Sequence, residues 1–283
     1  MGKPSPHLSA LIDLALSEDL GNGDLTTEAL FPASGRAKAR AVFLAKEPLV
    51  VSGLGVVEWV FRRLDETCQC QARVQEGAAV KDRTRLATLR GPLPALLSGE
   101  RTALNFLRHL CGVATLTRRY VEALAGTGCT LLDTRKTTPG LRALEKAAVR
   151  AGGGKNHRTG LFDGVMIKDN HIAAAGSIRL ALHKARQRVP PTVKIEVECQ
   201  DRKQVQQALD GGADIIMLDN MDLTQMARAV KLVGGRAKTE ASGRIQLATL
   251  RQVAETGVDY ISVGALTHSA PNVDISLEIL PAR

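Results

Sequence analysis

Two adjacent cations, Arg135 and Lys136, follow a short apolar segment in the sequence LDTRKTTPG, residues 132–140. A buried cation is costly unless an anionic group pairs with it. The two residues therefore either lie harmlessly at the surface or bind a negatively charged ligand. For any single basic residue the surface is the ordinary explanation, so the choice depends on what else in the chain gathers around them.

Further basic residues stand in two other polar segments. His157 and Arg158 lie in GGGKNHRTG, and Lys168 lies in MIKDN. The planar guanidinium of arginine donates two parallel hydrogen bonds to a carboxylate, whereas lysine is a point charge that suits phosphate. Several residues of both types at one place would predict a ligand that carries carboxylates and phosphates.

Two acidic residues, Glu198 and Asp219, end apolar segments of their own. A pair of carboxylates among cations could hold Mg²⁺, which takes few protein ligands and keeps several waters. The alternative is that they pair with Lys136 and Lys168 and only balance charge. Glu196 lies two residues before Glu198, so both point to one side of a regular strand, and we expect Glu196 to lie deeper and to pair with a base.

Small residues follow two later apolar segments, in EASGR and SVGALTH. Ser242, Gly243 and Gly264 would expose backbone N–H groups close to the starts of helices. Loops after the last strands of an α/β barrel often bind a phosphate in this way. The sequence therefore suggests a phosphate site near these three residues.

The elements that position these residues alternate in type after Thr127. Short apolar segments alternate with helical stretches, which predicts a parallel sheet covered by helices. Six such units fit either an open, doubly wound sheet or a (β/α) barrel. An open sheet binds ligands mainly at one switch point, whereas a barrel brings all strand ends to one mouth. Polar or glycine residues follow every segment, so we favour the barrel. The predicted strands are 130–134, 164–168, 193–198, 214–218, 237–241 and 259–263.

The first ~115 residues mix both kinds of element and predict an α+β domain. We expect the domains to be 1–115 and 116–269. The long helical stretch from Leu93 to Leu124 closes the first part. The other expected elements are helices at 7–20 and 55–66, strands at 39–47, 49–53 and 68–74, and a small β-element at 76–92.

Composition narrows the class of protein. The chain has 283 residues, of which 44% are apolar and 24% charged, as in soluble globular proteins. We find no apolar stretch near the ~18 residues that suggest a membrane span, and acids interrupt the N-terminal segment as they would not in a secretory signal. These features predict a cytoplasmic protein. The five cysteines are then expected to be reduced and to act as small apolar fillers, since the lone CxC at Cys68 and Cys70 makes a poor zinc site.

The net charge of +9 could indicate binding to nucleic acid. However, the bases are dispersed, and aromatic residues make up only 3% of the chain, too few for base-stacking platforms. A small polyanionic substrate fits the charge at least as well. Charge alone does not decide between these two partners.

The motifs taken together resemble the quinolinate phosphoribosyltransferase family. The likeness is strongest over residues 132–172 and includes ERTALNFL, KIEVECQ, IIMLDNM, EASGRI and VDYISVGALTHSAP, in the order and spacing of that family. It runs from about Glu18 to the C-terminus. It implies an N-terminal α/β sandwich joined to an incomplete (β/α) barrel, with the active site at the carboxyl ends of the strands. A C-terminal segment, 270–283, is expected to return to the N-terminal domain.

The resemblance also implies an activity. Family members transfer phosphoribosyl from phosphoribosyl pyrophosphate to quinolinate with Mg²⁺. Pyrophosphate and CO₂ leave, and nicotinate mononucleotide is formed for NAD synthesis. Members form homodimers, sometimes hexamers, whose active sites share residues across the interface. Neither a covalent nucleophile nor a nucleic-acid or membrane partner is expected.

The family's functional residues carry over to matching positions in this sequence. By this resemblance the carboxylates of quinolinate are expected to meet Arg135, His157, Arg158 and Lys168, with Arg101 arriving from the other subunit. The ribose and its Mg²⁺ are expected near Lys136, Glu198 and Asp219. The 5′-phosphate is expected near Ser242, Gly243, Gly264 and His268. One departure is Arg244, where relatives more often carry Gly or Asn, and we expect its side chain to face solvent.

Three rival interpretations stay open from sequence. A barrel aldolase could use Lys168 or Lys136 as a Schiff base. A close relative could act on a different acid or serve another role, although the set of basic residues favours a dicarboxylate. A nucleic-acid-binding protein could use the net positive charge, in which case its binding would depend steeply on salt.

Overall fold

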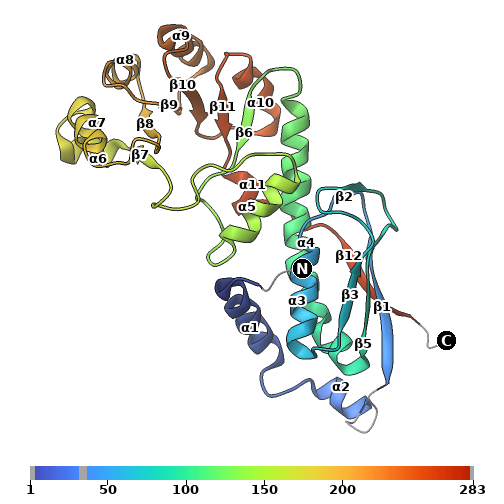
Figure 1. Cartoon of the computed structure of the whole chain (residues 1–283). Helices are drawn as coiled ribbons and strands as arrows, with labels where there is room; N and C mark the ends of the chain where they lie inside the picture. The colour runs from blue at the N-terminus through green and yellow to red at the C-terminus, as the bar shows by residue number, and fades with distance from the viewer. Residues whose placement is uncertain (1–3, 32–36, 281–283) are drawn as a thin grey trace. The chain divides into compact units, whose positions relative to one another are not determined.

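A computed structural model describes residues 4–31 and 37–280 (Figure 1). The chain divides into two compact units, and a long helix, α4 (Leu93–Ala123), contains one of the division points. The first unit comprises residues 1–116, 150–152 and 270–283, and the second comprises 117–149 and 153–269. In the described part of the chain, no helix is both long and apolar enough to cross a membrane.

The first unit contains an antiparallel four-stranded sheet with the order β12-β1-β5-β3. Its last strand comes from the end of the chain and pairs with β1 over six residues, from Arg40 opposite Leu280 to Ala45 opposite Ile275. Residues 275–280 of the segment 270–283 thus lie in the sheet of the first unit, while residues 281–283 lie outside the described residues. The strands are β1 (Lys38–Ala45), β3 (Gln69–Ala72), β5 (Arg85–Pro92) and β12 (Ile275–Leu280), with a separate short pair, β2 (Leu49–Val50) and β4 (Ala79–Val80).

Helices α1 (Pro6–Leu20), α2 (Leu25–Leu30) and α3 (Leu54–Leu64) belong to the same unit. The side chain of Ser5 accepts the N–H of Leu8, which caps α1 in the usual way for a serine. Helix α3 buries an apolar face that includes Phe61, and its ring meets that of Phe43 edge-on at a centroid distance of 6.2 Å. This core fixes α3 against the sheet.

The second unit is built on a parallel six-stranded sheet with the order β6-β11-β10-β9-β8-β7 (Figure 1). Strands that follow one another from β7 to β11 are neighbours, and β11 pairs back with β6, so the strands wind in one direction. Among the described strands, β6 and β7 form the two edges of this sheet and do not pair, so the barrel is not closed. The strands are β6 (Thr130–Leu132), β7 (Val165–Ile167), β8 (Ile195–Cys199), β9 (Ile215–Asp219), β10 (Lys238–Ser242) and β11 (Tyr260–Ser262).

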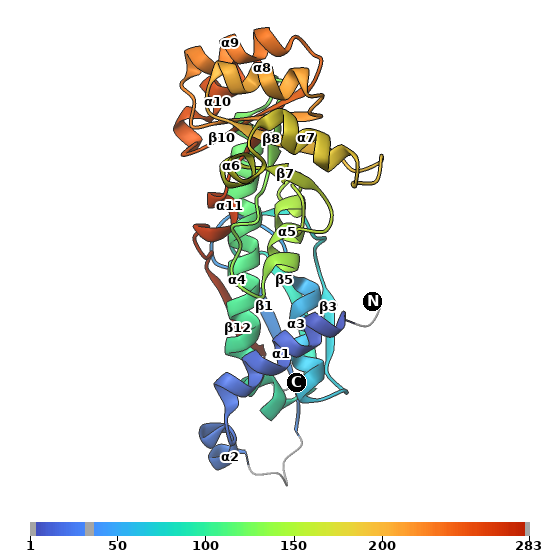
Figure 2. The ribbon, with the colours of Figure 1, turned by 90° about the vertical axis from the view of Figure 1, so that its left-hand side faces the viewer.

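A helix follows each strand of this sheet. Helices α7, α8 and α9 lie side by side on its outer side (Figure 2). Asp201 and Asp222 cap α8 and α9 by accepting an N–H three residues further on. The helices are α5 (Arg142–Ala151), α6 (Asp169–Ala175), α7 (Ile178–Arg186), α8 (Arg202–Asp210), α9 (Leu223–Val233), α10 (Leu247–Ala254) and α11 (Ala265–His268).

The predicted fold class, an N-terminal α/β domain with an incomplete α/β barrel, is confirmed. A doubly wound sheet would reverse its strand order at a switch point, and this order does not reverse. The six predicted strands are all present, although several are shorter than expected, as with β7 at three residues. Helices α2, α5, α6 and α11 were not predicted.

Candidate active site

The carboxyl ends of the six parallel strands lie along one edge of the sheet, because parallel strands all end on the same side. Every one of these ends carries a residue of the predicted site. They are Arg135 and Lys136 after β6, Lys168 after β7, Glu198 in β8, Asp219 and Ser242 at the last positions of β9 and β10, and Gly264 after β11.

Lys168 and Glu198 form an ion pair across neighbouring strand ends. The lysine side chain is 43% exposed, while the glutamate side chain is only 11% exposed. The ammonium therefore covers the carboxylate and leaves its own outer side toward solvent. This contact agrees with the interpretation that the two groups balance each other's charge when no ligand is bound.

Lys136, Gly264 and His268 lie together at the β6 and β11 ends. A Cβ placed on Gly264 would lie 3.0 Å from Cδ of Lys136 and 3.1 Å from Nε2 of His268, so the small residue leaves room for both side chains. The hydroxyl of Thr267, which is 1% exposed, donates to the carbonyl of Lys136 at 2.8 Å. The start of α11 thus fixes the backbone that carries Lys136.

The ends of β9 and β10 meet through Asn220, whose N–H donates to the carbonyl of Ser242 at 3.0 Å. Gly243 has a φ of +103°, and a Cβ there would lie 2.3 Å from the side-chain oxygen of Asn220, so this position requires glycine. Arg244 is exposed and also left-handed, with a φ of +50°. Because Gly and Asn adopt that conformation most readily, the geometry gives a reason why relatives would carry them there. Asp219 accepts a hydrogen bond from the Asn220 amide at 2.8 Å.

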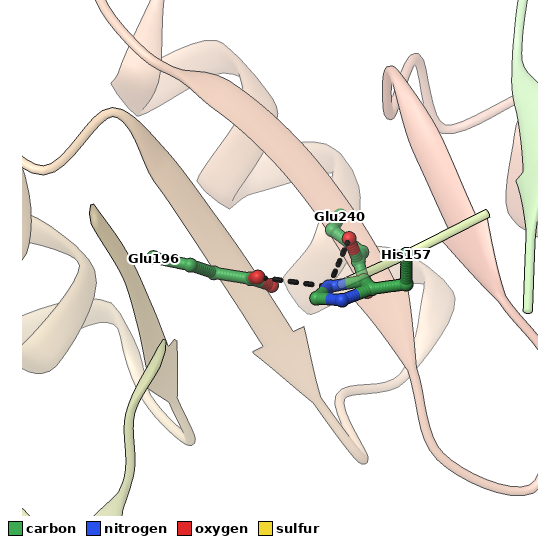
Figure 3. A group of neighbouring side chains, drawn as sticks. All are labelled: His157, Glu196 and Glu240. Carbon is green, nitrogen blue, oxygen red and sulfur yellow. Dashed lines mark hydrogen bonds and ion pairs between the residues drawn. The ribbon is translucent and has the colours of Figure 1, made fainter. Parts of the chain in front are cut away.

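His157 lies inside the barrel unit, with both ring nitrogens in use. Its Nδ1 accepts the backbone N–H of Arg158 at 2.7 Å. Its Nε2 lies 2.9 Å from a carboxylate oxygen of Glu196 and 3.6 Å from one of Glu240 (Figure 3). Burial opposes a charge on the ring, but the hydrogen bond to Glu196 and the charges of both carboxylates outweigh it and raise the pKa of His157. Glu196 is 3% exposed and pairs with this base, as the sequence predicted.

Glu240 is fully buried, and neither of its carboxylate oxygens has a hydrogen-bond partner among the described residues. Burial and the nearby charge of Glu196 raise the pKa of Glu240 to about 7. The carboxyl group can therefore hold a proton near neutral pH. Glu240 was not singled out in the sequence, although its place two residues before Ser242 on the same side of β10 was a usable signal.

His157, Glu196 and Glu240 are close enough together to hold a metal ion in principle. The hydrogen bonds argue against that use. Nδ1 of His157 faces an N–H donor, so the ring proton belongs on Nε2, the atom that would have to bind the metal. A metal-bound histidine normally donates its other nitrogen's proton to an acceptor, the reverse of this arrangement. We therefore interpret the cluster as a hydrogen-bonded group.

Arg135 and Arg158 bring two guanidinium groups close to each other. Burial and then the charge of Arg135 lower the pKa of Arg158. Nη1 of Arg158 donates to the carbonyl of Gly164 at 3.0 Å, which orients the group. Nε of Arg135 is buried with no hydrogen-bond partner in the described part of the chain. Two neighbouring cations with spare donors favour an anion between them.

A cavity of about 570 Å³ opens beside this cluster in the second unit. His157, Arg158, Glu196 and Glu240 line it, and it extends to the starts of the strands at Lys194 and Lys238. Arg135, Lys168, Glu198 and Asp219 do not line it. The described site thus has two parts, a cavity lined by His157 and Arg158 and a second part along the strand ends.

The structure does not bring every predicted residue together. Arg101 lies on α4 in the first unit and is exposed, so its role across a subunit interface stays a prediction. The buried ion pair between Lys146 and Asp133, close behind His157, was not predicted.

A barrel mouth that gathers cations, two carboxylates and backbone N–H groups is the site of an enzyme for strongly anionic substrates. Comparison with known proteins gives a more specific assignment. Residues 24–111 match "Quinolinate phosphoribosyl transferase, N-terminal domain", and residues 113–278 match the C-terminal domain of the same family. The chain belongs to the quinolinate phosphoribosyltransferase family and is a phosphoribosyltransferase.

Individual relatives support this assignment over nearly the whole chain. A Bacillus subtilis protein named "Probable nicotinate-nucleotide pyrophosphorylase [carboxylating]" is 46% identical over 273 residues, 96% of this chain and 93% of the relative. "Quinolinate phosphoribosyltransferase [decarboxylating] 1b" of Nicotiana tabacum is 40% identical over 98% of this chain and 83% of its own. The crystal structure of NadC from Streptococcus pyogenes matches with a TM-score of 0.91 at 40% identity, covering 99% of this chain and 100% of that one.

Proposed function

We propose that this chain transfers phosphoribosyl from phosphoribosyl pyrophosphate to quinolinate with decarboxylation. The products would be nicotinate mononucleotide, pyrophosphate and CO₂, as a step of NAD biosynthesis. The observation that carries the proposal is the gathering of cations and carboxylates at the ends of six parallel strands, in a chain of this family. Its substrates would be two polyanions, which agrees with the net charge of +9.

Quinolinate would bind through its two carboxylates. Arg135 and Arg158 offer guanidinium donors, and Lys168 would turn its ammonium from Glu198 toward the ligand. His157 would contribute its charge when protonated, at the expense of the hydrogen bond from the Arg158 N–H. Fixing the planar ring in one orientation presents its nitrogen to the sugar, and such positioning lowers the barrier of a bimolecular step.

The first bond changes would take place at C1 of the ribose. The quinolinate nitrogen bonds to C1 as the bond from C1 to pyrophosphate breaks, through a sugar with oxocarbenium character. Lys136 would stabilise the departing oxygens electrostatically. Ser242, Gly243, Gly264 and His268 would hold the 5′-phosphate, with backbone N–H groups near the start of α11.

Loss of CO₂ would follow on the same ring. The bond between C2 and its carboxylate breaks, the electron pair stays on C2 beside the cationic nitrogen, and C2 then takes up a proton. The charge on the ring nitrogen stabilises this carbanion, so the protein need supply only orientation and neutralisation of charge. This scheme includes no covalent nucleophile.

We also propose that Glu198 and Asp219 hold Mg²⁺. Both are carboxylates on neighbouring strands at the part of the site along the strand ends, and they leave room for water and phosphate oxygens, which suits an ion that keeps few protein ligands. When bound, Mg²⁺ would neutralise charge on the pyrophosphate leaving group. Glu198 would have to loosen its ion pair with Lys168.

A Schiff-base aldolase is the less favoured function. The amine of Lys168 is held in an ion pair with Glu198, which turns it away from a carbonyl that it would have to attack. The proposal also includes a homodimer, with Arg101 completing the partner's site and a hexamer possible, and a cytoplasmic location. It includes no nucleic-acid partner.

Product formation tests the proposal. The purified protein is supplied with quinolinate, phosphoribosyl pyrophosphate and Mg²⁺, and nicotinate mononucleotide is measured by mass spectrometry. We expect its formation to require both substrates and to stop when EDTA removes the metal. A protein that makes no nicotinate mononucleotide, or that is trapped by borohydride with a carbonyl substrate, would contradict the proposal.

A further inference from the structure

Helix α5 carries three charged residues on one face, at positions i, i+3 and i+4: Arg142, Glu145 and Lys146. Such a face ordinarily lies in water. Here Glu145 is fully buried and Lys146 is 2% exposed, while Arg142 is half-buried. Buried charges are costly without partners. The groups that these three side chains bond therefore indicate the role of this face of α5.

Lys146 holds the backbone of His157. Its ammonium donates to a carboxylate oxygen of Asp133 at 2.5 Å and to the carbonyl of His157 at 3.1 Å. The same oxygen of Asp133 accepts the N–H of His157 at 2.8 Å. The ion pair is almost fully buried, with side-chain exposures of 3% and 0%. His157 is therefore fastened at both its N–H and its carbonyl.

Asn156 completes this arrangement. Its side-chain amide donates to the second carboxylate oxygen of Asp133 at 2.7 Å and to the carbonyl of Lys146 at 2.9 Å. Asp133 follows β6 directly, so the contacts tie residues 156 and 157 both to a strand end and to α5. The segment just after the glycines at 152–154 is thus held by a buried charged group.

Arg142 and Glu145 hold the other cation-bearing loop. Nη2 of Arg142 donates to the carbonyl of Arg135 at 3.4 Å, and Nη1 donates to that of Thr159 at 3.2 Å. A carboxylate oxygen of Glu145 accepts the N–H of Thr138 at 3.1 Å. One face of α5 thus contacts the backbone on both sides of the paired guanidinium groups.

We propose that Arg142, Glu145 and Lys146 are positioning residues, which hold the loops of Arg135 and His157–Arg158 at the spacing that binds quinolinate. This inference rests on the proposed function. Lys146 contacts the His157 loop alone, whereas Arg142 bonds the carbonyl of Arg135 and the hydroxyl of Thr137 on either side of Lys136. The carbonyl of Lys136 itself is held by Thr267 of α11. The physical reason is preorganisation: guanidinium groups fixed in advance bind a planar dicarboxylate without a further ordering cost.

Two variants test the α5 face, and two others serve as comparisons. Lys146→Met removes the buried ammonium, and Arg142→Met removes a half-buried group whose loss leaves the core intact. Lys203→Met makes the same change at an exposed lysine of α8. Thr267→Val removes the hydroxyl that holds Lys136 but keeps the shape of the side chain.

Hydrogen–deuterium exchange of the whole chain measures the positioning itself and needs no substrate. We expect Lys146→Met to speed exchange at residues 156–158 and Arg142→Met to speed it at 135–138, each at least about ten-fold, with α7–α10 unchanged. Lys203→Met is expected to change neither segment. Uniformly faster exchange would mean general loss of stability, and unchanged exchange would mean that α5 does not hold the loops. Either result would overturn the inference.

Steady-state kinetics measure the consequence. We expect both α5 variants to raise the KM for quinolinate at least about ten-fold. Lys146→Met, which does not touch the neighbours of Lys136, should leave the KM for phosphoribosyl pyrophosphate within about two-fold, whereas Thr267→Val should raise that KM and leave the KM for quinolinate within about two-fold. Parallel changes in both KM values of Lys146→Met would overturn the inference. An inactive wild-type protein would refute the proposed function, and the exchange result would still decide whether α5 holds the loops.

Discussion

Arg135 and Arg158 are the residues on which recognition of a dicarboxylate depends most. Burial and then the charge of Arg135 lower the pKa of Arg158, and Arg135 keeps a buried donor with no partner among the described residues. Two such cations favour an anion between them. Asp219 stands apart from them, at the last position of β9. Different substitutions should accordingly change the KM values of the two substrates.

Substitution of these residues tests that division. We predict that Arg135→Ala raises the KM for quinolinate about thirty-fold or more, because truncating one partner of a charged contact costs about 2–5 kcal/mol. Asp219→Ala should chiefly impair use of phosphoribosyl pyrophosphate and shift the Mg²⁺ requirement upward. Steady-state kinetics with each substrate varied measure both effects. Arg179→Ala, at an exposed arginine of α7, is the control, and unaltered parameters in both variants would refute the assignment.

Glu240 gives a prediction for stability. Its pKa rises from 4.5 to about 7 in the folded protein, so between these values the folded state binds a proton that the unfolded state has lost. The contribution of this proton to the free energy of unfolding is fully present below about pH 4.5 and is lost as the pH rises through about 7. Relative to Glu240→Gln, the wild type should lose about 2 kcal/mol of unfolding free energy between about pH 5 and about pH 7.5. Urea unfolding at both pH values measures this, and a parallel pH dependence in the two proteins would show that the group does not titrate as described.

At the scale of elements, the parallel strands do most of the positioning. Each strand is short, and the residues of the proposed site stand at its last positions or just after it, so the sheet order alone brings distant parts of the chain to one edge. Helix α5 also positions two of the site's loops, because its side chains bond the backbone of Arg135 and His157. Strand β12 has a different task, since it forms one edge of the antiparallel sheet of the first unit and places Ile275, which is 2% exposed, in the core.

That role of β12 leads to a matched pair of variants. We predict that Ile275→Ala lowers the free energy of unfolding by about 2–4 kcal/mol, because it leaves a cavity in the core. Ile279→Ala removes the same atoms from a residue of the same strand that is 38% exposed, and should cost under about 1 kcal/mol. Chemical denaturation gives both values. Equal costs at the two positions would mean that β12 does not seal the core as described.

The whole chain shows which features a sequence reveals. Alternation of apolar strands and helices predicted the barrel, and the residues after each strand predicted which groups would share an edge. The face of α5 was missed, because Arg142, Glu145 and Lys146 look like a solvated surface until their partners are known. Glu240 was missed for the same reason, since the sequence of β10 does not show that Glu196 of β8 lies close to it. Contacts between segments far apart in sequence leave no local pattern.

The assembled protein gives a prediction that one chain alone cannot satisfy. If Arg101 completes the site of a partner subunit, mixing inactive Arg101→Ala with inactive Lys136→Ala should restore activity, because some hybrid dimers would contain one intact site. Activity of the mixture, after subunit exchange has been verified by mass spectrometry, measures this. No recovery would count against a shared site.

Crystals soaked with quinolinate test the central claim most directly, since the claim concerns where the charges meet. We predict density for one planar ring at the carboxyl ends of the strands, with its carboxylates in contact with Arg135, Arg158 and Lys168. Quinolinate bound on another face, or out of contact with both arginines, would contradict the account.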